Sequence, residues 1–283
     1  MFEAVLKYSF LQNAVAASFL ASIACGIIGT MIVEKKLVMM SGGIAHTAFG
    51  GVGMGYFFRI EPIVGALIFS LLASFGIARI HREMDTHTDI LMGLFWSIGM
   101  AAGILFIAFT PGYPPDISSY LFGDILTLTR SDLTVMVLLD IFVLATVAVL
   151  FDALKIYLFD EEFLIVKGIS VRLFDYLLFA MIAAAVVLLI RVAGIILVIA
   201  LLTAPVAIAK SFVCNLKSIM VISCLLGMFF CIVGLWVSYE LQIASGATIV
   251  IMCGLSYMSV VFFRRFASGM KTATDRVGEG MHD

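Results

Sequence analysis

Residues 42–51 read Gly42-Gly43-Ile44-Ala45-His46-Thr47-Ala48-Phe49-Gly50-Gly51, and they place one imidazole inside a glycine-rich segment fit for burial in a lipid bilayer. An ionisable side chain at membrane depth is costly and usually faces a bundle interior or an aqueous cavity. Imidazole is also the commonest metal-ligating side chain. We interpret His46 as a candidate metal ligand. The alternative is a packing residue whose ring hydrogen-bonds a backbone carbonyl or Ser41.

The composition of the chain is that of a membrane protein. Of its 283 residues, 63% are hydrophobic and 13% are charged. The mean hydropathy is +1.17, whereas soluble domains average about half apolar and about a quarter charged residues. The net charge of −2 excludes a strongly basic surface for nucleic acid. The cysteines lie in or beside apolar runs and are interpreted as small buried residues rather than disulfides.

Apolar runs of spanning length recur along the whole chain. The residues beside Arg191, Val192-Ala193-Gly194, predict either a tight turn or a break within a longer helix. We expect an all-α transmembrane bundle of about eight or nine helices over residues 1–263, followed by a cytoplasmic tail over 264–283. The runs lie near 10–33, 38–58, 62–80, 90–110, 132–151, 174–190, 192–209, 218–240 and 246–263.

The basic residues predict the orientation of the chain. Of the 17 Lys and Arg residues, 13 fall in one set of connecting loops and 4 in the other. The positive-inside rule then puts the N-terminus outside and the C-terminus in the cytoplasm, in the cytoplasmic (inner) membrane. The smaller set is Lys7, Arg59, Arg130 and Arg191, and the larger set is Lys35, Lys36, Arg79, Arg82, Lys155, Lys167, Arg172, Lys210, Lys217, Arg264, Arg265, Lys271 and Arg276.

One segment on each side is not membrane-spanning. On the cytoplasmic side, residues 152–175 predict a short amphipathic charged helix, a glycine stop at Gly168 and a second short helix. On the outer side, turn residues over 110–116 precede a short apolar stretch over 120–126, which we interpret as an extracytoplasmic mouth. The chain has no phosphate-binding loop, so any ATP chemistry must come from another polypeptide. It also lacks a metalloprotease motif and a nucleophilic arrangement, which argues against an enzyme.

Few intramembrane carboxylates are available to join His46. Asp140 interrupts an apolar run and is our first choice of partner, although a protonated acid hydrogen-bonded within the bundle is the alternative. Glu240 ends an apolar run at the outer face, and Asp124 lies in the short apolar stretch. One imidazole with one or two carboxylates suits Zn²⁺ or Mn²⁺. We expect helix packing, rather than ligand binding, from Gly43, Gly50, Gly51 and Gly55.

Motifs in order along nearly the whole chain are similar to those of the metal-ion permease family of ATP-binding-cassette importers, which take up zinc and manganese. The resemblance implies a homodimeric permease in the lipid bilayer, with no tightly bound cofactor. It also implies two cytoplasmic ATPase subunits that bind ATP and grip residues 152–175, and an extracytoplasmic metal-binding protein. The motifs are Gly43-Ile44-Ala45-His46, residues 120–126 with Ser131-Asp132-Leu133, Phe159-Asp160-Glu161-Glu162-Phe163 with Gly168-Ile169, residues 192–197 with 201–207, and Ser238-Tyr239 with 245–250.

The resemblance also implies how transport would be coupled to ATP. The coupling surface is expected over Phe159 to Ile169, with the acidic side chains Asp160, Glu161 and Glu162 facing the ATPase and Phe163 and Leu164 filling a groove in it. The predicted function is ATP-driven alternating access for Zn²⁺ first and Mn²⁺ next. Two alternatives stay open: a permease of related architecture for iron chelates or cobalamin, and an ATP-independent ion transporter.

The chain departs from the family pattern close to His46. Many members carry an aspartate one turn before the histidine, and Gly42 stands there in this chain. The Leu-Pro-Gly that often follows the histidine is Phe49-Gly50-Gly51, and Ala244 replaces the proline before Ser245. Any ligand that joins His46 must therefore come from another helix.

Overall fold

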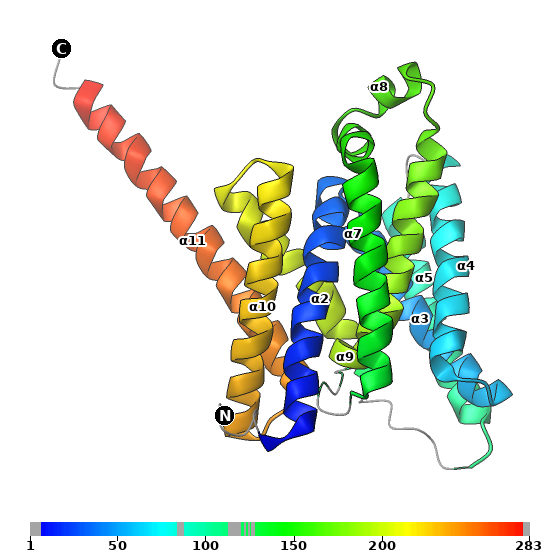
Figure 1. Cartoon of the computed structure of the whole chain (residues 1–283). Coiled ribbons are helices and arrows are strands. Elements are labelled where there is room, and N and C mark those ends of the chain that lie inside the picture. Colours follow the sequence, from blue (N-terminus) through cyan, green and yellow to red (C-terminus); the bar gives the residue numbers. More distant parts are fainter. Residues whose placement is uncertain are drawn as a thin grey trace.

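The computed structural model describes residues 7–83, 88–112, 120–121, 123, 125 and 128–279, and this part of the chain is a bundle of helices (Figure 1). Long apolar segments form helices in lipid because a helix satisfies its own backbone hydrogen bonds. The helices are α2 (Ser9–Glu34), α3 (Val38–Phe58), α4 (Pro62–Glu83), α5 (Thr88–Phe109), α7 (Arg130–Phe159), α8 (Glu161–Val166), α9 (Val171–Phe212), α10 (Leu216–Leu241) and α11 (Ser245–Glu279).

Eight helical segments within the described residues are long and apolar enough to cross a membrane. α3 is not one of the eight, although it is 21 residues long. Its residues from Met40 to Val52 are all buried, so protein rather than lipid surrounds most of its length. With α3 counted, helical segments lie at all nine expected ranges, and the expectation of an all-α transmembrane bundle is confirmed.

The chain reverses direction inside α9, at Gly194. The backbone of Gly194 has φ 70° and ψ 164°, a conformation that interrupts a helix and that glycine adopts without steric cost. Lys210 near the end of α9 pairs with Glu34, and Asp175 near its start pairs with Arg82. Both ends of α9 therefore lie at the same end of the bundle, and α9 supplies two spans, Val171–Ile190 and Gly194–Phe212. Of the two sequence-based alternatives, the tight turn at Gly194 between two spans is correct.

The helices form two neighbouring groups joined by α9. α3 packs against α4 and α5, whereas α2 packs against α10 and α7. α9 contacts members of both groups, and α11 packs against α9 and α10. In Figure 1, α11 extends beyond the rest of the bundle at the end that carries α8. The boundary expected at residue 263 falls inside this continuous helix.

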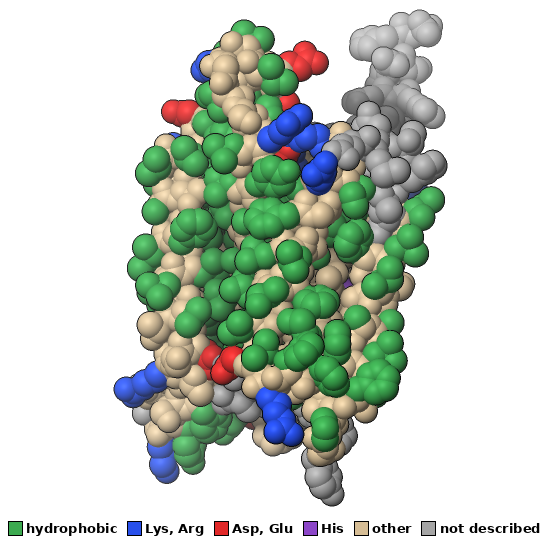
Figure 2. All heavy atoms as spheres, turned by 90° about the vertical axis from the view of Figure 1, so that its right-hand side faces the viewer, with side chains coloured by type: hydrophobic (Ala, Val, Ile, Leu, Met, Phe, Trp, Pro, Cys, Tyr) green, Lys and Arg blue, Asp and Glu red, His purple; other side chains and the backbone are tan. Residues whose placement is uncertain are grey.

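The two ends of the bundle are polar and the middle is apolar. Figure 2 shows hydrophobic side chains over the middle of one face, with Lys, Arg, Asp and Glu towards the ends. One end carries α8 together with the last residues of α2, α4 and α7, and we call it the α8 end. The described members of the larger basic set, such as Lys35 and Lys210, lie on segments at this end.

The segment over 152–175 differs in part from its sequence-based prediction. α7 continues to Phe159, so the first part of the segment extends a spanning helix. α8 is the expected short charged helix, and it ends before Gly168 as expected. The second short helix was wrong: Val171 begins the long helix α9 directly. Ser170, at the N-cap position, is extended and makes no side-chain capping hydrogen bond, and the apolar run that follows it continues directly as a spanning helix.

Candidate metal pathway around His46

α3 approaches its two neighbours at backbone distance, because glycines face each other across the contacts. A Cβ atom added to Gly50 would lie 2.9 Å from the carbonyl oxygen of Gly99 in α5. One added to Gly51 would collide with the backbone of Gly65 in α4. One added to Gly55 would lie 2.6 Å from the Cα of Pro62. Small residues permit such close approach of helices in membranes.

Gly43 has a different environment from the other three glycines. Its nearest neighbour for an added Cβ is the Sδ atom of Met92, at 3.6 Å, which is an ordinary van der Waals distance. An alanine would therefore fit at this position. The close contact between α3 and its neighbours begins further along the helix, from Thr47, which faces Gly99, onwards.

His46 lies inside the bundle with neither ring nitrogen paired. The residue is 6% exposed, and in the described part of the chain Nδ1 and Nε2 have no hydrogen-bond partner. Its ring contacts the indole of Trp96 in α5, with the ring centroids 3.9 Å apart. Buried polar groups are nearly always paired, so two unpaired nitrogens on one ring call for a partner that the described residues do not supply. The packing alternative, a hydrogen bond from the ring to Ser41 or a backbone carbonyl, is not formed among the described residues.

The hydroxyl groups of Ser41 and Thr47, near His46 in the sequence, donate hydrogen bonds to carbonyl groups of α3. Ser41, the partner considered in the packing alternative, donates its hydroxyl to the carbonyl of Val38 at 2.8 Å. Thr47 donates to the carbonyl of Gly43 at 2.7 Å. Gly42, one turn before His46, faces the Trp96 ring and Ile199 of α9. The surroundings of His46 within this chain are consequently aromatic and aliphatic.

Asp140 lies on a different contact surface from His46. It is 4% exposed on α7, which packs against α2, α8 and α9, whereas α3 packs mainly against α4, α5 and α9. Its electrostatic neighbours include the thiols of Cys25 in α2 and Cys224 in α10. Its Oδ2 atom has no hydrogen-bond partner among the described residues. The structure thus buries both His46 and Asp140 but does not bring them together.

Of the other two predicted carboxylates, Glu240 lies among the described residues, towards the end of the bundle opposite α8. Glu240 is exposed near the end of α10. Asp124 lies outside the described residues. Within the described part of the chain, no three His, Cys, Asp or Glu side chains gather closely enough to hold a metal ion. One copy of this chain therefore offers a ligand at His46 rather than a complete coordination sphere in its described part.

The surface of α8 carries both acidic and apolar side chains. Asp160 caps the helix, its carboxylate accepting a hydrogen bond from the Phe163 amide at 3.0 Å. Glu161, Glu162 and Phe163 are exposed. Leu164 is fully buried against its own chain, so the expectation that it fills a groove in a partner was wrong. A helix this short buries one side and exposes the others, and Leu164 lies on the buried side.

The turn after α8 favours a glycine. Gly168 has φ 72°, in the left-handed region that favours glycine, and no atom would lie within 4 Å of an added Cβ. Its amide donates to the Ile165 carbonyl at 2.9 Å, and the Ile169 amide donates to the Leu164 carbonyl at 3.2 Å. These bonds end the helix as C-terminal caps commonly do.

Three features of these sites were not predicted from the sequence. Trp96 was treated as part of an apolar run, and the nearby Gly99, whose added Cβ would lie 2.6 Å from the Cα of Thr47, was the available signal of a close helix contact. Ile165 and Val166 are 64% and 82% exposed, so they extend the apolar surface of α8. Lys35 was counted only as a basic loop residue. Its ammonium donates a hydrogen bond to the Glu161 carboxylate. Burial lowers the pKa of Lys35, and the bond to Glu161 opposes part of that shift.

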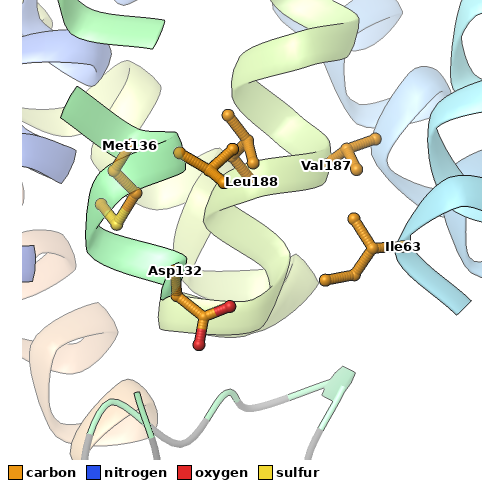
Figure 3. A pocket seen from close by; sticks show the side chains of 6 residues that line it. Ile63, Asp132, Met136, Val187 and Leu188 are labelled. Atoms are coloured by element: carbon orange, nitrogen blue, oxygen red, sulfur yellow. The ribbon is translucent and has the colours of Figure 1, made fainter. Parts of the chain in front are cut away.

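A second candidate site is an apolar groove between α4 and α7 with α9 at its base (Figure 3). Its one charged lining residue, Asp132, belongs to the capping box of α7, where its carboxylate accepts a hydrogen bond from the Thr129 amide at 2.9 Å. A single capping carboxylate among alkyl side chains is a poor metal site. The remaining lining residues are Ile63, Val135, Met136, Val187 and Leu188.

The fold and the buried imidazole together define a multi-pass helical membrane protein with a polar group held in its interior. Residues 7–264 match the ABC 3 transport family, and the chain belongs to that family. The resemblance to metal permeases of ATP-binding-cassette transporters is confirmed, and the chain is a transport component rather than an enzyme.

Three curated relatives illustrate the match. The chain is 41% identical over 260 residues to an uncharacterized membrane protein of Synechocystis, covering 92% of each chain. It is 34% identical over 255 residues to a probable metal transport system membrane protein of Chlamydia trachomatis, covering 88% of this chain and 87% of that one. It is 29% identical over 262 residues to the manganese transport system membrane protein MntC of Halalkalibacterium halodurans, covering 93% and 90%.

A solved structure shares the fold. The structure of PsaBC from Streptococcus pneumoniae in complex with Fab contains a chain that superposes with a TM-score of 0.83 at 27% identity. The match covers 92% of this chain and 93% of that one. The arrangement of helices described above is therefore that of an ABC transport permease.

Proposed function

We propose that this chain is the permease subunit of an importer that moves a divalent transition-metal ion into the cytoplasm, with His46 as a ligand in the pathway. The observation that carries the proposal is the imidazole itself, which is 6% exposed and has both nitrogens unpaired within the described residues. A neutral imidazole with free nitrogens is a good ligand for first-row divalent ions.

Mn²⁺ is the first cargo to test and Zn²⁺ the second, which reverses the order reached from sequence. The reversal rests on MntC, a relative named for manganese. Both ions accept nitrogen and oxygen ligands, and selectivity between them comes from geometry and availability as much as from affinity. Iron chelates and cobalamin remain the alternative cargo because Trp96 and Ile199 give the surroundings of His46 an aromatic and apolar character.

A second copy of the chain would complete the pathway. The described residues of one copy hold no cluster of three metal-ligating side chains, whereas an ion in transit needs several ligands. A homodimer would add a second His46. Water and the carboxylates Asp140, Glu240 and Asp124, whose roles stay predictions, are further candidates. ATPase subunits would bind α8, and a metal-binding protein would dock at the opposite end, where the N-terminus is expected outside.

The α8 surface supports the proposed contact with an ATPase. Phe163, Ile165 and Val166 are 46%, 64% and 82% exposed at the end of the bundle where most basic residues gather. An exposed apolar cluster beside acidic side chains is typical of a protein interaction surface. ATP hydrolysis in the partner would then drive alternating access around His46.

The test is uptake of ⁵⁴Mn²⁺ and ⁶⁵Zn²⁺ into proteoliposomes that contain the permease, its ATPase and its binding protein. We expect ATP-dependent uptake of one ion in the wild type, and a fall of at least about tenfold in His46→Ala and His46→Gln, as for lost ligand interactions elsewhere. Gln keeps a polar side chain of similar size without the imidazole. Wild-type uptake in both variants would remove His46 from the pathway, and no uptake of either metal by the wild type would favour the chelate alternative.

A parallel variant examines the separated carboxylate. Asp140→Asn keeps the shape of the side chain and removes its charge. A loss of uptake equal to that of His46→Ala would assign Asp140 to the pathway. Unchanged uptake would instead show that Asp140 is a buried acid outside the ion pathway. In every variant, co-purification of the ATPase checks that the complex still assembles.

A further inference from the structure

At the α8 end, a chain of side-chain contacts joins α8 to four other helices. Lys35, directly after α2, pairs with Glu161 of α8, and its ammonium lies 3.9 Å from the centre of the Tyr157 ring in α7. The Tyr157 hydroxyl donates to Oδ1 of Asp175 in α9 at 2.6 Å. Asp175 in turn pairs with Arg82 in α4. Lys35 is the member that contacts α8 itself.

The central members of this chain are sheltered from solvent. The Lys35 side chain is 12% exposed and Tyr157 is 1% exposed, whereas the Glu161 side chain is 50% exposed. Exposed ion pairs contribute little because water screens them. A sheltered ammonium that is held by both a carboxylate and an aromatic face has a stronger and more fixed geometry. Lys35 therefore ties Glu161 to the body of the bundle.

Lys35 is also joined closely to α3. Only Lys36 and Leu37 separate it from the first residue of α3, Val38. Lys36 has φ 58°, and the Leu37 amide donates to the Ile32 carbonyl of α2 at 2.8 Å, so the turn is tight and hydrogen-bonded. Leu37 is 4% exposed. A displacement of Lys35 therefore displaces the start of α3 as well.

α3, α4 and α5 are packed as one unit, because the backbone of α3 touches the backbones of both α4 and α5. The contacts of Gly51 with Gly65 and of Gly50 with Gly99 leave no side chain between the helices that could rearrange. We call these three helices the α3–α5 unit. It carries His46, and the contact chain reaches it at two points, the start of α3 beside Lys35 and the end of α4 at Arg82.

We propose that Lys35 is a positioning residue that transmits movement of α8 to the α3–α5 unit and so to His46. The inference deepens the proposed function, on which it rests, by naming the connection between the ATPase contact and the ion pathway. A movement of α8 pulls on Glu161, Glu161 pulls on Lys35, and the tight turn passes the displacement into α3. Asp175 and Arg82 hold the end of α4 to the same network.

The chain offers a matched control pair at the same end of the bundle. Lys210 pairs with Glu34, with Nζ and Oε2 2.8 Å apart. This ion pair joins α9 to α2 and includes no residue of α8. Like the Lys35–Glu161 pair, it joins a lysine to a glutamate. Its glutamate, Glu34, directly precedes Lys35 in the chain. Loss of the control pair should leave transmission from α8 intact.

The experiment measures ⁵⁴Mn²⁺ transported per ATP hydrolysed by the full complex with its binding protein. We expect Lys35→Met, which keeps the length of the side chain but not its charge, to lower this ratio about tenfold while ATPase co-purification is retained, a size usual for coupling between sites. Lys35→Arg should restore the ratio because guanidinium also binds carboxylate and stacks on tyrosine. Lys210→Met should keep the wild-type ratio.

A second readout is independent of cargo. In a Trp236→Phe background, 5-fluorotryptophan placed in the permease reports from Trp96 alone, beside His46. Its ¹⁹F resonance should shift when ATP and vanadate are added to the complex, and Lys35→Met should abolish the shift. If the wild type shows this shift without moving Mn²⁺ or Zn²⁺, and Lys35→Met abolishes it, the proposed cargo is wrong and the proposed transmission still holds.

Three results would overturn the role of Lys35. The first is a wild-type transport ratio and ¹⁹F shift in Lys35→Met. The second is an equal loss in Lys210→Met, because that loss would reflect general destabilisation of the helix ends. The third is loss of ATPase binding in Lys35→Met, which would make Lys35 part of the docking surface. If Lys35→Met does not reach the membrane, Glu161→Gln removes the same ion pair from its more exposed side, and the same outcomes apply.

Discussion

The imidazole of His46 lies against the indole of Trp96, with ring centroids 3.9 Å apart and ring planes inclined at 39°. Trp96 is 37% exposed, whereas His46 is 6% exposed. The indole therefore covers the imidazole on the side of α5. Access to the unpaired nitrogens of His46 depends on this one aromatic side chain as well as on the backbone of α3.

Truncation of Trp96 should expose His46 to reagents. Diethylpyrocarbonate reacts with a free imidazole nitrogen, and both nitrogens of His46 are unpaired in the described structure. We expect modification of His46, followed by peptide mass spectrometry, to be slow in the wild type and severalfold faster in Trp96→Ala. Trp236→Ala, which removes an exposed indole from α10, is the control. Equal rates in all three proteins would show that Trp96 does not cover His46.

Addition of one methyl group at Gly51 should destabilise the bundle. A Cβ there would lie 2.7 Å from the Cα of Ala66 and would collide with Gly65, so α3 and α4 must separate. We expect Gly51→Ala to lose about 1–3 kcal/mol of stability, as overpacked cores do. Thermal unfolding in detergent measures the effect.

Gly43→Ala provides the comparison on the same helix. Its added Cβ would meet Met92 at 3.6 Å, and alanine also forms helices better than glycine. This variant should unfold at or above the wild-type temperature. A loss in Gly43→Ala as large as that in Gly51→Ala would contradict the distinction between the two positions.

Replacement of Gly168 should weaken coupling by straining the turn after α8. The residue has φ 72°, and a left-handed conformation costs other residues about 1–2 kcal/mol. Because no atom lies within 4 Å of the added Cβ, the effect is one of backbone conformation alone. Gly168→Val should lower metal transport per ATP hydrolysed.

Gly168→Asn separates backbone strain from loss of the glycine itself. Asparagine enters the left-handed region far more readily than a β-branched residue does. We expect its transport ratio to stay near that of the wild type, with co-purification of the ATPase as the check on assembly. Coupled transport by Gly168→Val at the wild-type ratio would be evidence against a rigid turn.

Residues read along the chain were enough to predict where the helical segments lie in the sequence. Apolar length placed the spans, and Gly194 marked the reversal within α9 because a glycine can leave the helical conformation there. The short helix α8 and its glycine stop followed from local rules for charge and capping. The prediction of a second short helix was wrong because the long helix α9 begins directly after Ser170. The residues that precede a short helix and a long helix look alike in sequence.

The neighbours of each side chain could not be read in the same way. His46 and Asp140 were paired because both were expected near the middle of the bilayer, yet they face different helices. Depth depends on distance along one helix, whereas the neighbour depends on rotation about the helix axis and on which helix lies beside it. Leu164 was assigned to a groove in a partner for the same reason, but its position around the α8 axis places it in the core of this chain.

The sequence by itself determined the class of protein, the spans, the position of α8 and the presence of a histidine in an apolar interior, because hydrophobic length and backbone propensity are local properties. Only the tertiary structure decided that Trp96 covers His46, that Asp140 lies on another contact surface, and that Lys35 holds α8. Those relationships arise from packing between segments far apart in the chain, and backbone contacts between facing glycines fix how closely the helices can approach.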